Sequence, residues 1–279
     1  RAKLSPCKKG IFRGLENVRI TEQGDVLTQV ESFFEYGSSF LQLTYRIYRE
    51  MPYIDVTARV NYNERGKALK LEIPCRRGDR YFAQTPYGRE NYPMDGAEYP
   101  AHRYAAVADG DSCLAVYNDS VFGQSCDGRK MYLTLLNGAA YCAHPIGDRP
   151  ILDRNRSIPF IEEGVHVFRF RLSCTTPDRL EREAQDFLQQ PYTVNFFPHG
   201  KGISMKNVAL DSDVLTISAF LREESGVYLC RIFNPTACRQ TATLGIAGSK
   251  KEIEIDPFCV STFAYESGRG IAERREMDV

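Results

Sequence analysis

Long runs in which apolar and polar side chains alternate constrain the fold of this chain more than any other feature. The alternation extends over residues 41–47, 54–62 and 69–73. Successive side chains of a β-strand point to opposite faces of its sheet, so each run has one face suited to burial and one suited to water. Long runs of this kind in series predict antiparallel strands of a large sheet.

The alternation continues further along the chain. Residues 112–117, 130–136 and 165–173 are also predicted strands, because apolar side chains recur there with a period of two. Between the first two of these, Asn118 and Asp119 are typical turn residues, and Gly123 follows shortly after them. We interpret this stretch as the turn of a β-hairpin.

One segment has helical spacing. Pro177 and Asp178 open it, apolar side chains follow at intervals of three and four, and Pro191 closes it. Residues 1–190 are therefore predicted to form one large β-sandwich that ends in this short helix. Residues 191–279 return to short strands at 214–221, 227–233, 240–246, 251–256 and 259–265, which predict a smaller C-terminal β-sandwich. The charged, aperiodic residues 266–279 are predicted to be a solvated end.

Composition excludes some classes of partner. The 279 residues are 43% hydrophobic, which is enough for one sizeable core or two smaller ones. The formal net charge of zero gives no electrostatic drive toward nucleic acid or an anionic membrane. No apolar run approaches the roughly 20 residues that span a bilayer. The nine cysteines are odd in number and several lie in apolar strands, which favours thiols in a reducing compartment and predicts a cytoplasmic protein.

Common catalytic motifs are missing from the sequence. There is no P-loop, no dinucleotide-binding glycine motif and no nucleophile elbow. None of the four histidines pairs with another at zinc-ligand spacing. We interpret His166 as a structural histidine within a strand, and His102 as the better candidate for contact with a sugar. The chain begins at Arg1 rather than Met, which we interpret as the start of a cut polypeptide.

Two groups of polar residues are candidates for a functional site. Glu162–Glu163 and Glu223–Glu224 are adjacent pairs, and neighbours in a strand point apart, so neither supplies the two facing carboxyl groups that glycoside cleavage needs. Residues 81–104 are rich in Tyr, Arg and Glu. Such a mixture suits a cleft for a polar ligand, and it equally suits a surface loop whose tyrosines pack on a sheet edge.

Several segments resemble the C-terminal region of family 38 glycoside hydrolases, the retaining α-mannosidases. Residues 97–105 are similar to a segment of that region in which a Glu-x-Pro-x-x-x-Trp pattern precedes a strand. Residues 115–123 resemble the family's Asn-Asp turn followed by an aromatic residue and glycine, and residues 132–137 and 164–170 resemble two of its strands. The motifs occur in the family's order nearly from end to end of the chain. Tyr104 and Asn137 stand where the family has Trp and Arg.

The resemblance implies a non-catalytic region. In the family, the zinc or other divalent metal and the Asp nucleophile belong to an N-terminal catalytic domain, so neither is expected here, and this chain alone is expected to be inactive. The implied fold is all-β: a large antiparallel β-sandwich like that of galactose mutarotases, one short helix, and a smaller β-sandwich. The implied partners are the catalytic domain and, through it, an α-mannoside or oligosaccharide. The oligomeric state stays open.

The resemblance also implies a role at the rim of the sugar site. A loop rich in Arg, Asp and Asn contributes to that rim in some members of the family, and Asp153, Arg154, Asn155 and Arg156 occupy the matching place. His102, Arg103 and Tyr104 complete the predicted substrate-binding set. Two alternatives remain: a stand-alone mutarotase-like enzyme that uses His102 or His166 with Glu98, and a carbohydrate-binding module without chemistry.

Overall fold

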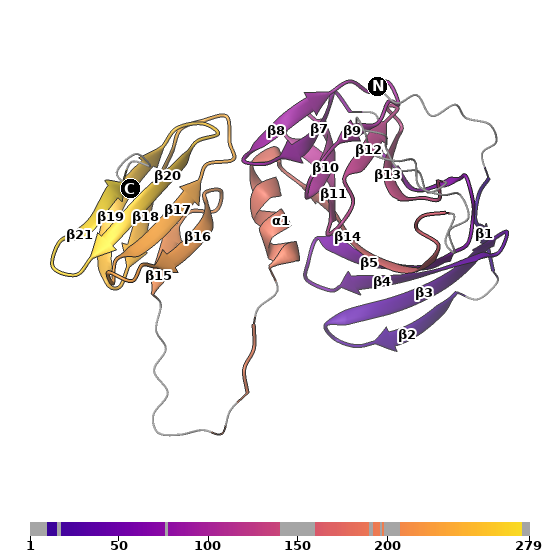
Figure 1. Cartoon of the computed structure of the whole chain (residues 1–279), viewed down its shortest axis with the longest axis horizontal. Helices are drawn as coiled ribbons and strands as arrows, with labels where there is room; N and C mark the ends of the chain where they lie inside the picture. Colours follow the sequence, from indigo (N-terminus) through magenta and orange to yellow (C-terminus); the bar gives the residue numbers. More distant parts are fainter. Residues whose placement is uncertain are drawn as a thin grey trace, which may run out of the picture. The chain divides into compact units, whose positions relative to one another are not determined.

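The computed structural model describes residues 10–15, 18–75, 78–139, 160–189, 192–195, 197 and 207–274. Two compact units divide the chain. The first consists of Arg1–Ala83 with Glu90–Thr175, and the second consists of Gln84–Arg89 with Thr176–Val279. Apart from one short helix and the turn of 3-10 helix before it, the elements of the described residues are strands, so the fold is all-β, as predicted (Figure 1). The predicted boundary near residue 190 falls next to residues outside the described ranges and stays a prediction.

The first unit is built on a ten-stranded antiparallel sheet with the order β1-β3-β4-β5-β14-β11-β10-β7-β8, in which β2 also pairs with β3. The predicted strands 41–47, 54–62, 112–117 and 165–173 are confirmed as β4, β5, β11 and β14. The strands are β1 (Arg13–Gly14), β2 (Arg19–Gln23), β3 (Leu27–Tyr36), β4 (Ser39–Tyr48), β5 (Tyr53–Tyr62), β7 (Arg80–Thr85), β8 (Gly88–Tyr92), β10 (Tyr104–Asp109), β11 (Ser112–Asn118) and β14 (Gly164–Thr175).

A second, four-stranded sheet has the order β6-β13-β12-β9 and closes the large sandwich. Its strands are β6 (Ala68–Pro74), β9 (Tyr99–Pro100), β12 (Gly123–Cys126) and β13 (Lys130–Asn137). One hydrophobic core joins residues of both sheets: Val60, Val116 and Phe170 come from the first, and Met131 and Leu133 from the second, each at most 1% exposed. The core therefore lies between the two sheets, on the side to which the apolar alternation of each strand points.

The turn after Asn118 differs from the prediction. β11 pairs with β10 and β14 in the large sheet, whereas β12 pairs with β13 and β9 in the other, so residues 119–122 carry the chain from one sheet to the other and form no hairpin. The turn itself is real. The Asn118 side chain accepts hydrogen bonds from the backbone amides of Ser120 (3.2 Å) and Val121 (2.7 Å). Turn residues reveal a reversal of the chain, but they do not reveal which strand will pair with the next one.

The predicted helix is confirmed. A short 3-10 turn at Pro177–Arg179 leads into α1 (Leu180–Leu188), whose buried residues are Leu180, Glu181 and Ala184. Their spacing of three and four places two apolar side chains on one face of the helix. Buried Glu181 accepts a hydrogen bond from the side-chain amide of Gln84, which satisfies its carboxylate inside the second unit. No helix in the described ranges has the length and hydropathy required to cross a membrane.

The second unit contains the smaller sandwich, with sheets in the orders β15-β18-β19 and β16-β17-β20-β21. Leu215, Ile232, Leu244 and Ile255 are at most 1% exposed and form its core. Its predicted strands are confirmed within two residues. The five predicted strands are β16 (Thr216–Arg222), β17 (Tyr228–Phe233), β18 (Gln240–Ile246), β19 (Ser249–Ile255) and β20 (Val260–Glu266). Two further strands, β15 (Val208–Asp211) and β21 (Gly270–Arg274), were not predicted.

The predicted solvated end was partly wrong. Residues 270–274 form β21, which pairs with β20 across the turn at 267–269. Gly268 and Gly270 have positive φ angles of 86° and 80°, a conformation that glycine adopts at low cost, and so they permit the reversal. Arg274 Nη1 also lies 2.9 Å from Glu223 Oε1. The strand was missed because charged side chains hide its short apolar pair, Ile271 and Ala272.

Candidate functional site

Two crossings between the sheets of the large sandwich lie where His102 and Arg103 of the predicted substrate-binding set are found. Residues 101–103 lead from β9 into β10, and residues 119–122 lead from β11 into β12. The Ala101 amide donates a hydrogen bond to the Phe122 carbonyl (2.9 Å), and the Asn118 amide donates one to the Arg103 carbonyl (2.9 Å). Asn118, which is 2% exposed, also donates from its side chain to the His102 carbonyl (3.2 Å). The two crossings are therefore held side by side.

His102 and Phe122 form a stacked pair at this place. Their ring centroids are 6.0 Å apart with an interplanar angle of 19°, and Phe122 is 60% exposed. Burial and the neighbouring Arg103 guanidinium lower the pKa of His102 below its usual value. At neutral pH the imidazole is therefore neutral, with one nitrogen that donates and one that accepts. An exposed aromatic face beside a neutral imidazole and an arginine suits the C–H face and hydroxyl groups of a sugar.

Tyr104 has a different environment. It is the first residue of β10, is 3% exposed, and meets the Tyr117 ring edge-on at 6.1 Å. It alternates with the core residue Ala105, so its ring is buried against Tyr117 on the face of β10 opposite to the sandwich core, and it holds the start of that strand in place. Of the three residues predicted in this segment, His102 and Arg103 remain partly exposed.

The tyrosines of the preceding segment serve the fold. Tyr92 and Tyr99 stack with centroids 4.6 Å apart, and their hydroxyl groups donate hydrogen bonds to the Pro100 carbonyl (3.0 Å) and the Asp95 carboxylate (3.1 Å). Tyr81 is 1% exposed in the core. Residues 81–104 were interpreted either as a ligand cleft or as a surface loop with packed tyrosines. Packed tyrosines describe most of the segment, and His102 and Arg103 are the partly exposed residues that a ligand can reach.

Glu98 is held as an ionised carboxylate. Burial would raise its pKa, but hydrogen bonds from Lys70 and from the Thr134 hydroxyl (2.7 Å) outweigh burial, so the pKa of Glu98 lies below its usual value. His166, the other partner considered for a mutarotase-like reaction, stacks on Phe168 and places Nε2 3.1 Å from the Glu162 carbonyl oxygen. The contacts of His102, His166 and Glu98 are thus made with three different sets of residues.

The remaining predicted positions divide into two groups. Asp153, Arg154, Asn155 and Arg156 lie outside the described residues. Glu163 forms an ion pair with Arg65 (2.7 Å), so this member of the acidic pairs is a partnered surface charge. Within the described ranges, no three His, Cys, Asp or Glu side chains gather closely enough to hold a metal ion, and we assign no step to a metal in this chain.

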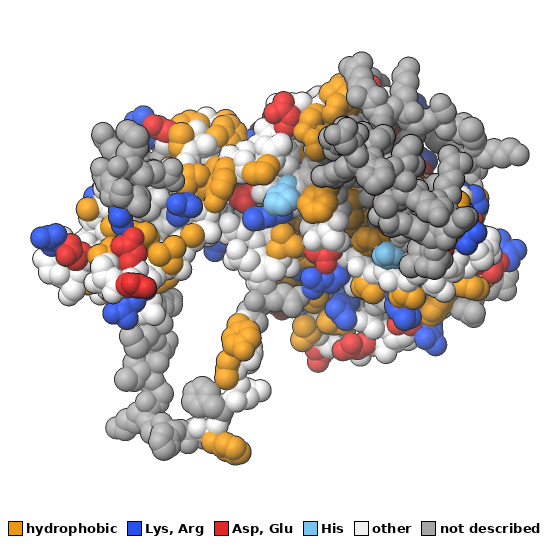
Figure 2. Space-filling model, in the orientation of Figure 1, with side chains coloured by type: hydrophobic (Ala, Val, Ile, Leu, Met, Phe, Trp, Pro, Cys, Tyr) orange, Lys and Arg blue, Asp and Glu red, His pale blue; other side chains and the backbone are white. Residues whose placement is uncertain are grey.

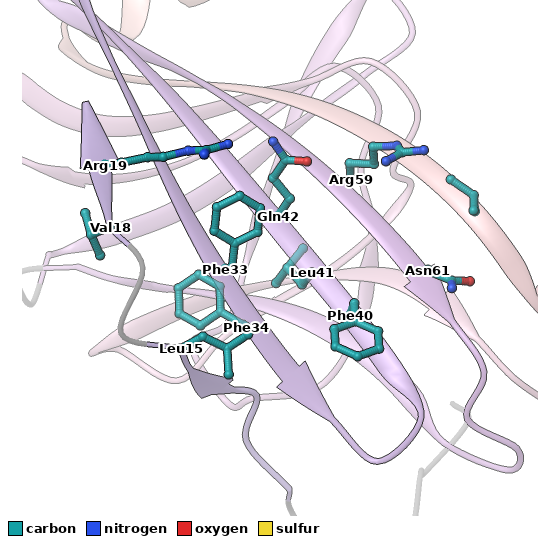
Figure 3. Close-up of a pocket in the computed structure, with 11 residues that line it drawn as sticks. Leu15, Val18, Arg19, Phe33, Phe34, Phe40, Leu41, Gln42, Arg59 and Asn61 are labelled. Atoms are coloured by element: carbon teal, nitrogen blue, oxygen red, sulfur yellow. The ribbon is translucent and has the colours of Figure 1, made fainter. Parts of the chain in front are cut away.

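Sequence reasoning missed one surface feature. A groove of about 740 Å³ lies on the large sheet, with Phe33, Phe40 and Arg59 among its lining residues (Figure 3). The alternation in β4 was read as apolar Leu41 and Leu43 against polar neighbours. Phe40, on the polar face of that strand, was the available signal.

The comparisons with known proteins were made for the whole chain. The family model described as the glycosyl hydrolases family 38 C-terminal domain matches residues 5–145, half of the chain. No curated protein matches the chain.

Two solved structures share its fold. An alpha-mannosidase from Enterococcus faecalis V583 superimposes with a TM-score of 0.76 at 13% identity, and the match covers 91% of this chain and 35% of that one. A protein in the glycosyl hydrolase family 38 from Enterococcus faecalis superimposes with a TM-score of 0.75 at 13% identity, and that match covers 91% and 36%. The chain thus spans about a third of the length of each of these structures.

Proposed function

The chain belongs to the family of C-terminal domains of family 38 glycosyl hydrolases, and from this membership we propose that it is the non-catalytic C-terminal portion of an α-mannosidase. In the intact enzyme, terminal α-D-mannosyl residues are hydrolysed by a preceding catalytic domain, on which this portion packs. The observation that carries the proposal is the family match over residues 5–145. The fold shared with an alpha-mannosidase across 91% of the chain supports it.

The second part of the proposal is that this portion lines the rim of the sugar site. The stacked pair of His102 and Phe122 offers an aromatic surface to the C–H face of a mannosyl unit, and Arg103 beside it offers hydrogen-bond donors to hydroxyl groups. Asp153, Arg154, Asn155 and Arg156, which lie outside the described residues, belong to the same proposal as further contacts of the substrate. Tyr104 contributes by fixing the start of β10.

The state of Glu98 favours this proposal over a mutarotase-like enzyme. A general acid near neutral pH requires a carboxyl group whose pKa is raised toward the working pH. Hydrogen bonds from Lys70 and Thr134 instead hold the pKa of Glu98 below its usual value. Glu98 is therefore expected to link β9 to its neighbours as a structural anion and to transfer no proton.

The test compares the isolated chain with the intact polypeptide. We expect hydrolysis of 4-nitrophenyl α-D-mannoside by the intact polypeptide only, and no catalysis of sugar mutarotation by the 279-residue chain. Mutarotation by the chain alone would refute the proposal in favour of a stand-alone enzyme.

Substitutions in the intact polypeptide test the rim. We expect Arg103→Ala, Arg154→Ala and Arg156→Ala each to lower kcat/KM by about tenfold, which corresponds to the loss of one charged hydrogen bond of about 1.4 kcal/mol. Exposed Arg129 lies in a turn before β13, so Arg129→Ala is the matched control and is expected to leave kcat/KM unchanged. If the three variants behave like the control, this chain does not contact the substrate.

We also propose that the protein resides in the cytoplasm. Among the described residues, cysteines such as Cys174, Cys238 and Cys259 are exposed, and none of the described cysteines forms a disulfide. Exposed thiols persist where the compartment is reducing. Fractionation of the source cells with an antibody against the chain tests this: recovery from an extracellular or oxidising fraction would contradict it.

A further inference from the structure

The two halves of the outer face of the ten-stranded sheet, the face turned away from the core, differ in exposure. On β7, β10 and β11 that face is buried: Phe82, Ala106 and Ala115 are at most 2% exposed. At the start of β4 and the start of β14 the same face is open, and Phe40 and Val165 are 55% and 57% exposed. The open half contains the groove of about 740 Å³. We call it the outer groove and define it by Val18, Arg19, Phe33, Phe40, Arg59 and Val165.

The register shows that these residues share one face. Directly opposed residues of antiparallel strands lie on the same side of a sheet. Phe33 is opposite Gln42, which is opposite Arg59, and in the next row Phe40 is opposite Asn61, which is opposite Val165. In the close-up, Arg19 and Arg59 stand on either side of Gln42 (Figure 3).

The apolar residues of this face are unusual for a solvated surface. A sheet with one face on the core normally carries polar side chains on the other. Here two phenylalanines and Val165 line the groove, and Val167, one position further along the same face of β14, is 55% exposed. The space-filling view shows hydrophobic side chains among charged ones where β2–β5 reach the surface (Figure 2). Polar Gln42, Arg59 and Asn61 lie between these apolar side chains, and such a mixture of exposed apolar and polar groups around a groove is typical of a protein interface.

Charge narrows the chemistry of the partner. Arg19 is matched within the groove, because it pairs with Glu31 (3.0 Å) and lies over the Phe33 ring at 5.5 Å. Gln42 donates to Glu31 (3.2 Å). Arg59 is exposed, and its side chain forms no hydrogen bond or ion pair with the described residues. A complementary surface therefore presents apolar side chains to Phe40 and Val165 and a carboxylate to Arg59.

The position of the groove points to one occupant. Leu15, which directly follows β1, forms part of its lining, so a polypeptide joined ahead of β1 would be tethered near the groove. A tethered domain has a high effective concentration at such a surface, so a contact of modest strength is sufficient to keep it docked. The solved structures that share the fold are about three times as long as the part that this chain matches.

We propose that the outer groove is the surface on which the catalytic portion of the same polypeptide docks, with apolar side chains over Phe40 and Val165 and a carboxylate on Arg59. This inference rests on the proposed function, because it assigns the place where the packing occurs. It is distinct from the proposed rim, which is formed by His102 and Arg103 at the crossings between sheets.

Cysteine labelling tests the assignment. Val165→Cys is prepared in the 279-residue chain and in the intact polypeptide, and the rate of maleimide labelling at that residue is measured by peptide mass spectrometry. We expect labelling to be at least tenfold slower in the intact polypeptide. Met51→Cys is the matched control, because Met51 has a similar exposure of 53% and lies in the turn between β4 and β5, at the other end of these strands. Its labelling rate is expected to be the same in both proteins.

A charge reversal in the intact polypeptide tests the predicted carboxylate. Arg59→Glu, added to Val165→Cys, is expected to restore at least half of the labelling rate of the isolated chain, whereas Arg129→Glu is expected to leave the protection unchanged. Equal labelling of residue 165 in the two proteins, with hydrolytic activity intact, would overturn the inference and leave the proposed function standing.

Two other occupants would give different results. Protection of residue 165 in the isolated chain that grows with protein concentration would assign the groove to a second copy of the chain. Protection by a soluble α-mannan would assign it to carbohydrate. Either result overturns the inference. If the source cells contain no polypeptide that is longer than this chain, the proposed function itself fails.

Discussion

A single asparagine is expected to determine much of the stability of the smaller sandwich. Asn234 is 0% exposed and follows β17 directly. The two N–H groups of its side-chain amide donate to three carbonyls, those of Cys238 (2.8 Å), Ile255 (3.0 Å) and Asp256 (3.0 Å), so one N–H is shared, and its side-chain oxygen accepts a hydrogen bond from the Thr236 amide (3.0 Å). One side chain thereby joins the turn after β17 to the end of β19.

The magnitude follows from the groups that lose their partner. An ordinary hydrogen bond contributes about 1 kcal/mol net, whereas a buried donor or acceptor left without a partner costs about 1–3 kcal/mol. The bonds to Ile255 and Thr236 are buried, and those to Cys238 and Asp256 are partly buried. We therefore expect Asn234→Ala to lower the free energy of unfolding of this unit by about 4 kcal/mol.

Two further variants distinguish the loss of the hydrogen-bond donors of Asn234 from the loss of side-chain volume. Asn234→Asp keeps the shape but turns a carboxylate toward three carbonyl oxygens, so we expect a loss at least as large. Asn61→Ala removes an exposed asparagine whose side-chain oxygen takes part in one long contact of 3.4 Å, and we expect a change within about 0.5 kcal/mol.

The chain has no Trp, so hydrogen exchange followed by mass spectrometry is the suitable assay. Peptides that cover β17–β19 are expected to lose protection in Asn234→Ala, whereas peptides that cover β5 keep theirs. Wild-type protection of β17–β19 in Asn234→Asp would refute the reasoning, because the three donated bonds could not then contribute as described.

Three more predictions concern the stability of the sandwiches. The hydrogen bond from Lys67 holds the pKa of Glu64 below its usual value, so the contribution of Glu64 to stability is present above the unfolded pKa of about 4.3 and is lost as the pH falls through the folded pKa. Glu64→Gln should lower the free energy of unfolding by about 2 kcal/mol at pH 7, and urea unfolding at pH 3 should show a clearly smaller loss. Arg171 donates hydrogen bonds to Asp55 at 2.6 and 3.0 Å, so Arg171→Met should lower the free energy of unfolding in urea by about 3 kcal/mol. The added change Asp55→Leu should recover most of this loss, and no recovery would contradict the pairing. Leu244 is 0% exposed, so Leu244→Ala should cost about 3 kcal/mol by hydrogen exchange, and a loss below about 1 kcal/mol would show that it is not a core residue.

The elements of the fold could be predicted from local pattern, but their partners could not. Alternation identified β4, β5 and β14 because the period of two within each strand shows which of its faces is apolar. It could not show that β14 pairs with β5, where Phe168 lies opposite Ala58, since that pairing depends on contacts between distant parts of the chain. The crossover after Asn118 was mistaken for a hairpin for the same reason. Residues 270–274 were missed because β21 is an edge strand that is stabilised by pairing with β20, and its own short sequence shows little alternation.

The candidate site was predictable only in part. His102 was singled out from the residues around it, but its stacking on Phe122 requires two crossings that meet in space, and no spacing rule predicts it. Tyr104 was grouped with His102 because they are neighbours in the sequence, although Tyr104 is buried against Tyr117 and His102 is partly exposed. The exposed Phe40 directly precedes the alternating run 41–47 and went unremarked, because a pattern shows which face is more apolar and not whether the other face is covered.

The most direct test of the central claim is the size of the native polypeptide, measured with an antibody against this chain in a lysate of the source cells. A non-catalytic portion of an α-mannosidase predicts a band far above 31.7 kDa, the mass of the chain itself. A band at 31.7 kDa would show that the chain works alone and would contradict the account.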